Sequence, residues 1–108
     1  MSILCPYDDE IENIKNQIIN KYTPKEIILF GSCAKGLVKR GSDIDLCVIL
    51  ETRDKRQTLR DMLAGIEYNV DLDIVIYTPS EWLRHKDDKA NFANIIKRTG
   101  VSLVGGFG

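Results

Sequence analysis

Hydrophobic residues recur in two stretches of this chain at the spacing of amphipathic helices. Ile11, Ile14 and Ile18 share one face of a helix predicted over residues 8–21, with acidic residues at its start. A second amphipathic helix is predicted after Arg56. Its apolar face consists of Leu59, Met62, Leu63 and Ile66. Both helices therefore have one face to bury against another layer of structure.

Three further stretches have the apolar runs and period of two that are typical of strands, at residues 26–30, 43–51 and 69–77. A helix lies between the second and third strands, so we expect a right-handed crossover that makes them parallel. The first strand ends at Gly31, close to where the second begins, so these two should be antiparallel. The predicted fold class is α+β, a small mixed β-sheet with helices packed on it.

The last third of the chain opens with a clear helix start. Thr78, Pro79 and Glu81 have the order of an N-cap, a first-turn proline and a capping-box acid, which predicts a helix to about residue 85. A second helix should turn Phe92, Ile95 and Ile96 inward and end at Gly100, and residues 101–104 can either form a short edge strand or simply pack against the domain. We expect residues 1–104 to form one domain, with residues 105–108 as a frayed tail.

Pairs of carboxylates at the starts of two predicted strands break the apolar pattern. Residues two apart share one face of a strand, so Asp43 projects with Asp45, and Asp71 projects with Asp73. Carboxylates held together repel one another and lose hydration unless a cation lies between them. Parallel strands place their starts at the same edge of the sheet. The topology therefore predicts that Ser32 lies with Asp43, Asp45 and Asp73 at one site.

A Gly-Ser pair ends the first strand. Gly31 allows a tight turn and a close approach of the backbone, and Ser32 can cap the short helix that follows, whose free N–H groups suit phosphate. Ten residues separate this pair from Asp43. In this context GSCAKGLVKRGSDIDL resembles the GS-x10-D-x-D signature of the DNA polymerase β-like nucleotidyltransferase superfamily, in its minimal (MNT) form.

The resemblance implies a polymerase β-like palm fold and a two-metal mechanism. Asp43, Asp45 and Asp73 would be the catalytic residues and the ligands of two Mg²⁺ ions, with Mn²⁺ as the alternative ion. Asp71, on the same face two residues earlier, is the competing position for the third carboxylate, and the resemblance favours Asp73 because the register of DIVIYTP matches the usual third strand. The nucleotide-binding residues would be Gly31, Ser32, Lys35 and Ser42. Lys35 stands where relatives often have arginine, so it keeps the charge and loses the bidentate fork.

Composition narrows the substrates. The chain has 108 residues, of which 44% are hydrophobic and 29% charged, and a formal net charge of −1, so it has no overall field that draws it to nucleic acid. Its basic stretch is local, at Lys35, Lys39 and Arg40. No apolar run is long enough for a membrane span, and three cysteines without metal-like spacing predict reduced thiols and a cytoplasmic protein.

The acceptor is not apparent in a chain of this length. The family resemblance implies ATP or another NTP as donor and a HEPN-type helical partner protein, in a toxin–antitoxin pair where the nucleotidyltransferase adenylylates its partner. A homo-oligomer could also complete the site. Two other functions stay open, which are transfer to a small molecule such as an antibiotic and a non-catalytic module that neutralises its partner by contact.

Overall fold

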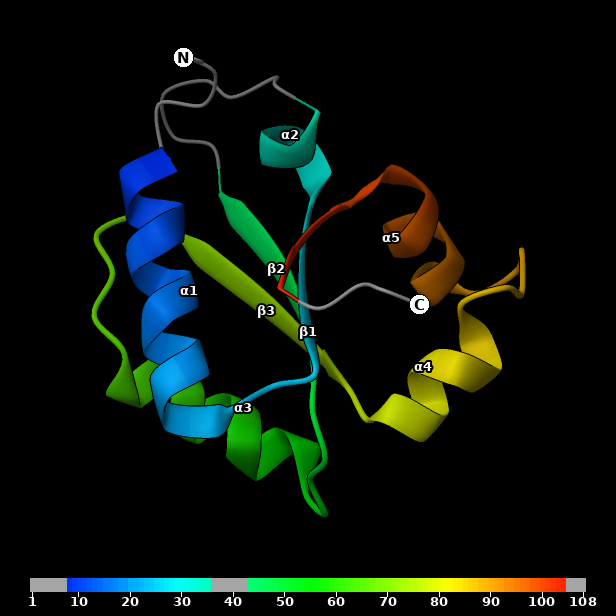
Figure 1. Ribbon diagram of the computed structural model, residues 1–108, viewed down its shortest axis with the longest axis horizontal. Coiled ribbons are helices and arrows are strands. Elements are labelled where there is room, and N and C mark those ends of the chain that lie inside the picture. Colours follow the sequence, from blue (N-terminus) through cyan, green and yellow to red (C-terminus); the bar gives the residue numbers. More distant parts are fainter. Residues whose placement is uncertain (1–7, 36–42, 105–108) are drawn as a thin grey trace.

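A four-stranded mixed sheet forms the centre of the molecule. The computed structural model describes residues 8–35 and 43–104. The strands lie in the order β3-β2-β1-β4 and comprise β1 (Glu26–Phe30), β2 (Ile44–Ile49), β3 (Leu72–Tyr77) and β4 (Val101–Val104). β2 is antiparallel to β1 and parallel to β3, and β4 pairs antiparallel with β1 (Figure 1). The predicted mixed sheet, its strand directions and its edge strand are confirmed.

One face of the sheet is covered by α1 (Asp8–Tyr22) and α3 (Lys55–Gly65) (Figure 1). Both helices follow the predicted amphipathic pattern, and Asp54 caps α3 by accepting the N–H of Gln57 at 3.1 Å. The side chains from this face of the sheet and its two helices form the larger core. Its fully buried members include Ile14, Ile18, Ile27, Ile44, Leu46, Val48 and Met62.

The opposite face is covered by α4 (Pro79–His85) and α5 (Phe92–Thr99). The predicted capping box is present, since the Thr78 hydroxyl accepts the Glu81 N–H and the Glu81 carboxylate accepts the Thr78 N–H. Trp82 is buried on this side, as expected for a packing residue. The smaller core consists of Ile28, Cys47, Ile49, Trp82, Ala93 and Ile96.

The prediction that Phe92, Ile95 and Ile96 all face inward is wrong for two of them. Only Ile96 is buried, whereas Phe92 is 48% exposed and Ile95 is 44% exposed. α5 packs through Ala93 and Ile96, which are three residues apart and so lie on one narrow stripe of the helix. A two-turn helix buries only that stripe and leaves its larger flanking side chains outside.

Two elements differ in detail from the prediction. β2 begins at Ile44 and β3 at Leu72, so Asp43 and Asp71 precede the strands instead of opening them. The short helix α2 (Gly31–Ala34) is a single turn whose N-cap is Phe30, and no side-chain hydrogen bond caps it. The predicted capping role of Ser32 is therefore wrong, because Ser32 is already the second residue of the helix.

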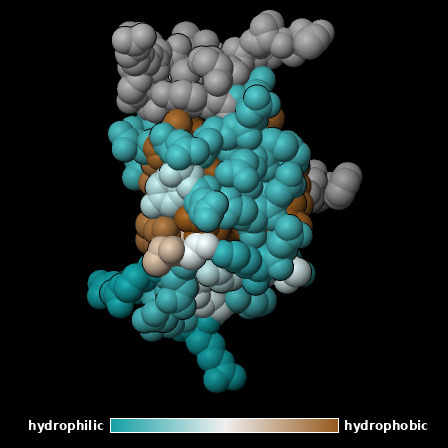
Figure 2. Space-filling view, turned by 90° about the vertical axis from the view of Figure 1, so that its left-hand side faces the viewer, coloured by the Kyte–Doolittle hydropathy of each residue, from teal (hydrophilic) through white to brown (hydrophobic). Residues whose placement is uncertain are grey.

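The outer surface on the α1 side is mainly hydrophilic. Figure 2 shows this side of the molecule, where hydrophobic residues gather in narrow strips between polar ones. This is the surface expected of helices that bury one stripe each. No helix in the described parts of the chain has the length and hydropathy needed to cross a membrane. Ser42, Lys39, Arg40 and residues 105–108 lie outside the described residues.

Candidate active site

Asp45 and Asp73 are neighbours across the parallel strands. Asp45 is the second residue of β2, and its register partner in β3 is Asp73. Burial raises the pKa of the Asp45 carboxyl, and the charge of Asp73, the charge of Asp43 and a hydrogen bond with Asp73 raise it further. The fold therefore holds like charges together at the start of two strands, as the strand patterns predict.

Asp43 and Asp71 lie just before these strands and help to fix their starts. The N–H of Ile44 donates to the carbonyl of Asp71 at 2.9 Å, which continues the parallel ladder by one step. The carbonyl of Asp43 accepts the thiol of buried Cys33 at 3.6 Å, which connects α2 to the start of β2. Asp43 is half-buried and acts on Asp45 through its charge.

The register separates the two candidates for the third carboxylate. Asp73 is in β3 and directly opposite Asp45, whereas Asp71 precedes the strand. Both side chains are exposed, and β3 is an edge strand of the sheet. Asp73 is therefore the carboxylate beside Asp45 that is open to an incoming molecule.

Gly31 provides the close approach that the sequence predicts. Its φ of +76° lies in the left-handed region, and a Cβ there would be 2.2 Å from Oδ2 of Asp45. Ser32 follows it and is half-buried, and Lys35 is exposed at the end of α2. The turn and the carboxylates thus meet at Gly31 and Asp45.

The carboxylate oxygens of this cluster are suitable ligands for a hard divalent cation, but their arrangement meets only part of what such an ion requires. Carboxylate oxygens are the ligands that Mg²⁺ takes, and the ion pairs found among residues 8–35 and 43–104 leave Asp45 and Asp73 without a cationic partner. Within the same residues, however, no three His, Cys, Asp or Glu side chains are arranged to hold one ion together. The structure thus provides an adjacent carboxylate pair, with Asp43 as a third charge near it.

An aromatic pair borders the carboxylates, and the sequence pattern did not indicate it. Phe30 is the register partner of Asp45 on the β1 side, so both side chains project from the same face of the sheet. The ring of Phe92 meets that of Phe30 edge-on, with 5.7 Å between their centroids. The helical spacing of Phe92 predicts a core position, but in the structure its ring is exposed and lies against Phe30 beside the carboxylates.

Comparison with known proteins identifies the family and the fold of this chain. The nucleotidyltransferase domain family matches residues 11–103 of the chain. The crystal structure of a presumed nucleotidyltransferase from Sulfolobus solfataricus has a similar fold, with a TM-score of 0.55, 17% sequence identity and coverage of 88% of this chain and 82% of that one. Comparison with the curated proteins gives no match. Because the family match spans most of its length, this chain belongs to the nucleotidyltransferase domain family, whose members are transferases of the EC 2.7.7 type.

Proposed function

We propose that this nucleotidyltransferase is a minimal (MNT) member of its superfamily that transfers AMP from ATP to a hydroxyl group on a partner protein and releases pyrophosphate. The observation that carries the proposal is the in-register pair of Asp45 and Asp73 beside the Gly31 turn. Nucleotidyl transfer requires a place where a triphosphate and an acceptor hydroxyl meet among oxygen ligands. The carboxylate pair and the turn supply such a place.

Asp43, Asp45 and Asp73 would hold two divalent ions, Mg²⁺ or Mn²⁺. Such ions neutralise the triphosphate and stabilise the attacking and leaving oxygens. Asp45 follows Asp43 by two residues in the chain and pairs with Asp73 across the strands, so it would help to hold both ions. The raised pKa of Asp45 has burial and these same two charges among its causes, so a cation would relieve part of the strain.

The remaining residues would orient the two substrates. Gly31 makes room for the Asp45 carboxylate against the start of α2, and the Ser32 hydroxyl of that helix can donate to a phosphate oxygen. Lys35 is exposed and adds a positive charge at the end of the turn, and Ser42 would complete the nucleotide site. Asp73 on the edge strand can accept the proton of the acceptor hydroxyl, because molecules can approach it from solvent.

A protein acceptor is favoured by the surface next to the carboxylates. Phe92 and Ile95 are 48% and 44% exposed and lie three residues apart on α5, and Phe92 contacts Phe30 beside Asp45. Exposed apolar side chains gathered near a polar site are typical of protein contact surfaces. We propose that a HEPN-type helical partner of a cytoplasmic toxin–antitoxin pair covers this surface and presents a tyrosine or serine hydroxyl.

The decisive experiment combines the protein with ATP, Mg²⁺ and a candidate HEPN-type partner protein, followed by mass spectrometry of the partner. We expect the partner to gain one adenylyl group per modified hydroxyl, and Asp45→Asn to abolish the modification. Parallel reactions with GTP, CTP and UTP identify the donor. A partner that is neutralised without gaining mass would contradict transfer and support the contact-only module instead.

A further inference from the structure

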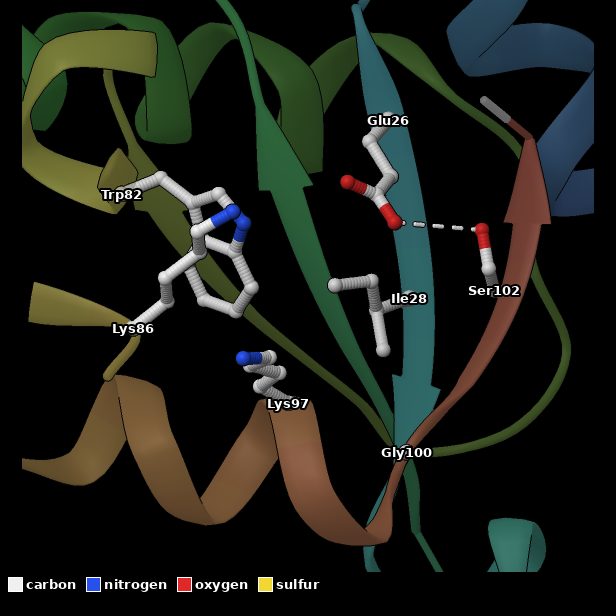
Figure 3. A pocket seen from close by; sticks show the side chains of 7 residues that line it. All are labelled: Glu26, Ile28, Trp82, Lys86, Lys97, Gly100 and Ser102. Atoms are coloured by element: carbon white, nitrogen blue, oxygen red, sulfur yellow. Dashed lines mark hydrogen bonds between the residues drawn. The ribbon is translucent and has the colours of Figure 1, made fainter. Parts of the chain in front are cut away.

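A cavity of about 370 Å³ lies between β1, β4 and the two helices of the smaller core. Figure 3 shows that its walls come from distant parts of the chain, with Glu26 and Ser102 on the strand side and Lys86 and Lys97 on the helix side. This volume is within the range of small-molecule sites. The carboxylate site described above does not use these residues.

The two walls carry opposite charge. The side chains of Glu26, Lys86 and Lys97 extend toward the same space from opposite sides (Figure 3). Glu26 Oε2 accepts a hydrogen bond from the Ser102 hydroxyl at 3.2 Å, which holds the carboxylate at the strand wall. Glu26 pairs with Ile49 of β2, so its side chain lies on the face of the sheet that carries the smaller core. Burial, and after it the charge of Glu26, raise the pKa of Cys47 on the same face.

The ammonium groups are available to a ligand. Lys97 pairs with Asp87, but both partners are exposed, at 45% and 68%, and such pairs contribute little to stability. Lys86 follows α4 and is half-buried. A ligand anion that enters the cavity can therefore replace Asp87 beside Lys97 at small cost and reach Lys86 as well.

The floor of the cavity is apolar. Trp82 and Ile28 line it, and their side chains are 7% and 4% exposed. An aromatic ring and an aliphatic side chain suit the carbon skeleton of a ligand. The cavity thus offers three kinds of contact within one space, which are cationic, anionic and apolar.

We propose that this cavity binds a phosphate monoester that carries sugar hydroxyls, such as a sugar phosphate. Lysine ammonium groups bind phosphate as point charges, which suits Lys86 and Lys97. The Glu26 carboxylate accepts hydrogen bonds from hydroxyl groups at the opposite wall, and the sugar ring lies over Trp82 and Ile28. A ligand with phosphate at one end and hydroxyls at the other can place its phosphate at the lysines of the helix wall and its hydroxyls at Glu26 of the strand wall.

The cavity and the carboxylate site are at opposite ends of the same strand. Glu26 pairs with Ile49, and Phe30 pairs with Asp45. Glu26 is therefore four positions along β1 from the residue that lies beside the carboxylate site. At the rise of a strand this is about 13 Å. The proposal therefore does not depend on the transferase activity, and its failure would leave that activity unaffected.

Trp82 provides a direct assay because it is the only tryptophan of the chain. Ribose 5-phosphate is titrated into the intact protein while the tryptophan emission is recorded, with inorganic phosphate and ribose as separate ligands. We expect ribose 5-phosphate to change the emission and to bind more tightly than either part alone. Lys86→Gln should weaken its binding about tenfold or more, as loss of a charge-assisted contact predicts. Lys15→Gln, on the other face of the sheet, makes the same charge change and should have no effect.

Glu26→Gln is the sharper variant because the proposal predicts effects of opposite sign. It removes a negative charge near the phosphate, so inorganic phosphate should bind more tightly. It also removes the charged acceptor of the sugar hydroxyls, so ribose 5-phosphate should bind several-fold more weakly. Unchanged emission with ribose 5-phosphate at millimolar concentration, or equal weakening by Lys86→Gln and Lys15→Gln, would overturn the proposal. A Glu26→Gln variant that binds both ligands more tightly would overturn the role of the sugar hydroxyls.

Discussion

Replacing Gly31 with alanine tests how closely the turn and the carboxylate are fitted together. The φ of Gly31 is +76°, and the left-handed conformation costs an L-residue about 1–2 kcal/mol. The added Cβ would lie 2.2 Å from Oδ2 and 3.1 Å from Cγ of Asp45, so the carboxylate has to rotate away. An off-rotamer side chain costs about 0.5–1.5 kcal/mol. Gly31→Ala should therefore lower the free energy of unfolding by about 1.5–3.5 kcal/mol.

Urea unfolding followed by circular dichroism measures this change, and Gly65→Ala is the matched control. Gly65 ends α3 without a left-handed φ, and the nearest atom to its added Cβ is Lys21 Nζ at 3.7 Å. This control should gain about 0.4–1 kcal/mol, because alanine restricts the unfolded chain. Opposite signs for two Gly→Ala changes in one protein would exclude a general effect of the substitution.

An Asp45→Ala background separates the two causes. Without the carboxylate, Gly31→Ala should lose the contact part of its cost and keep the backbone part, about 1–2 kcal/mol. A cost that is unchanged in this background would refute the contact between Gly31 and Asp45. A cost below about 0.5 kcal/mol in both backgrounds would refute the backbone argument as well.

Three further predictions concern the carboxylates and the apolar surface. Asp45→Asn should raise the melting temperature at pH 7 without metal by about 1–5 °C. Burial and neighbouring carboxylates raise the pKa of Asp45 in the fold, so this gain should shrink as the pH falls through that pKa. A gain in melting temperature that grows in acid would contradict this reasoning. Asp73→Asn should lower turnover by at least about a hundredfold with little change in ATP affinity, whereas Asp71→Asn should change turnover little. If single-turnover assays show the larger loss for Asp71→Asn, the third carboxylate is Asp71. Ile95→Asp should abolish modification of the partner while ATP binding measured by calorimetry stays normal. Leu83→Asp, which changes another exposed apolar residue, on α4, should leave both unchanged.

The parts of the fold that follow from local rules were predictable from the sequence. β1 has the predicted bounds, because the apolar run between Pro24 and Gly31 is too short for a helix and is bounded by residues that interrupt strands. α4 also has its predicted bounds, since Thr78 and Glu81 form a capping box that needs no tertiary partner. The parallel pairing of β2 and β3 followed from the crossover rule, and it placed two carboxylates at one edge.

The errors arise where tertiary packing decides. The periodicity of α5 marks Phe92 and Ile95 as apolar, but it does not show that Ala93 and Ile96 are the residues that contact the sheet. The cavity was not predictable either, because Glu26, Lys86 and Lys97 come from three separate elements and follow no common spacing. Their proximity results from the packing of α4 and α5, which the sequence pattern leaves open.

The placement of Asp45 on β2 explains how the fold keeps like charges together. Leu46, Cys47 and Val48 follow it directly and are 0% exposed, so this strand is buried on both faces. A shift of register by one residue would exchange the two faces and expose both cores, which makes the pairing with β1 and β3 rigid. The carboxylates at the strand start therefore cannot move apart by sliding. Protonation relieves their repulsion as the pH falls, and at neutral pH a bound cation would relieve it without any rearrangement of the sheet.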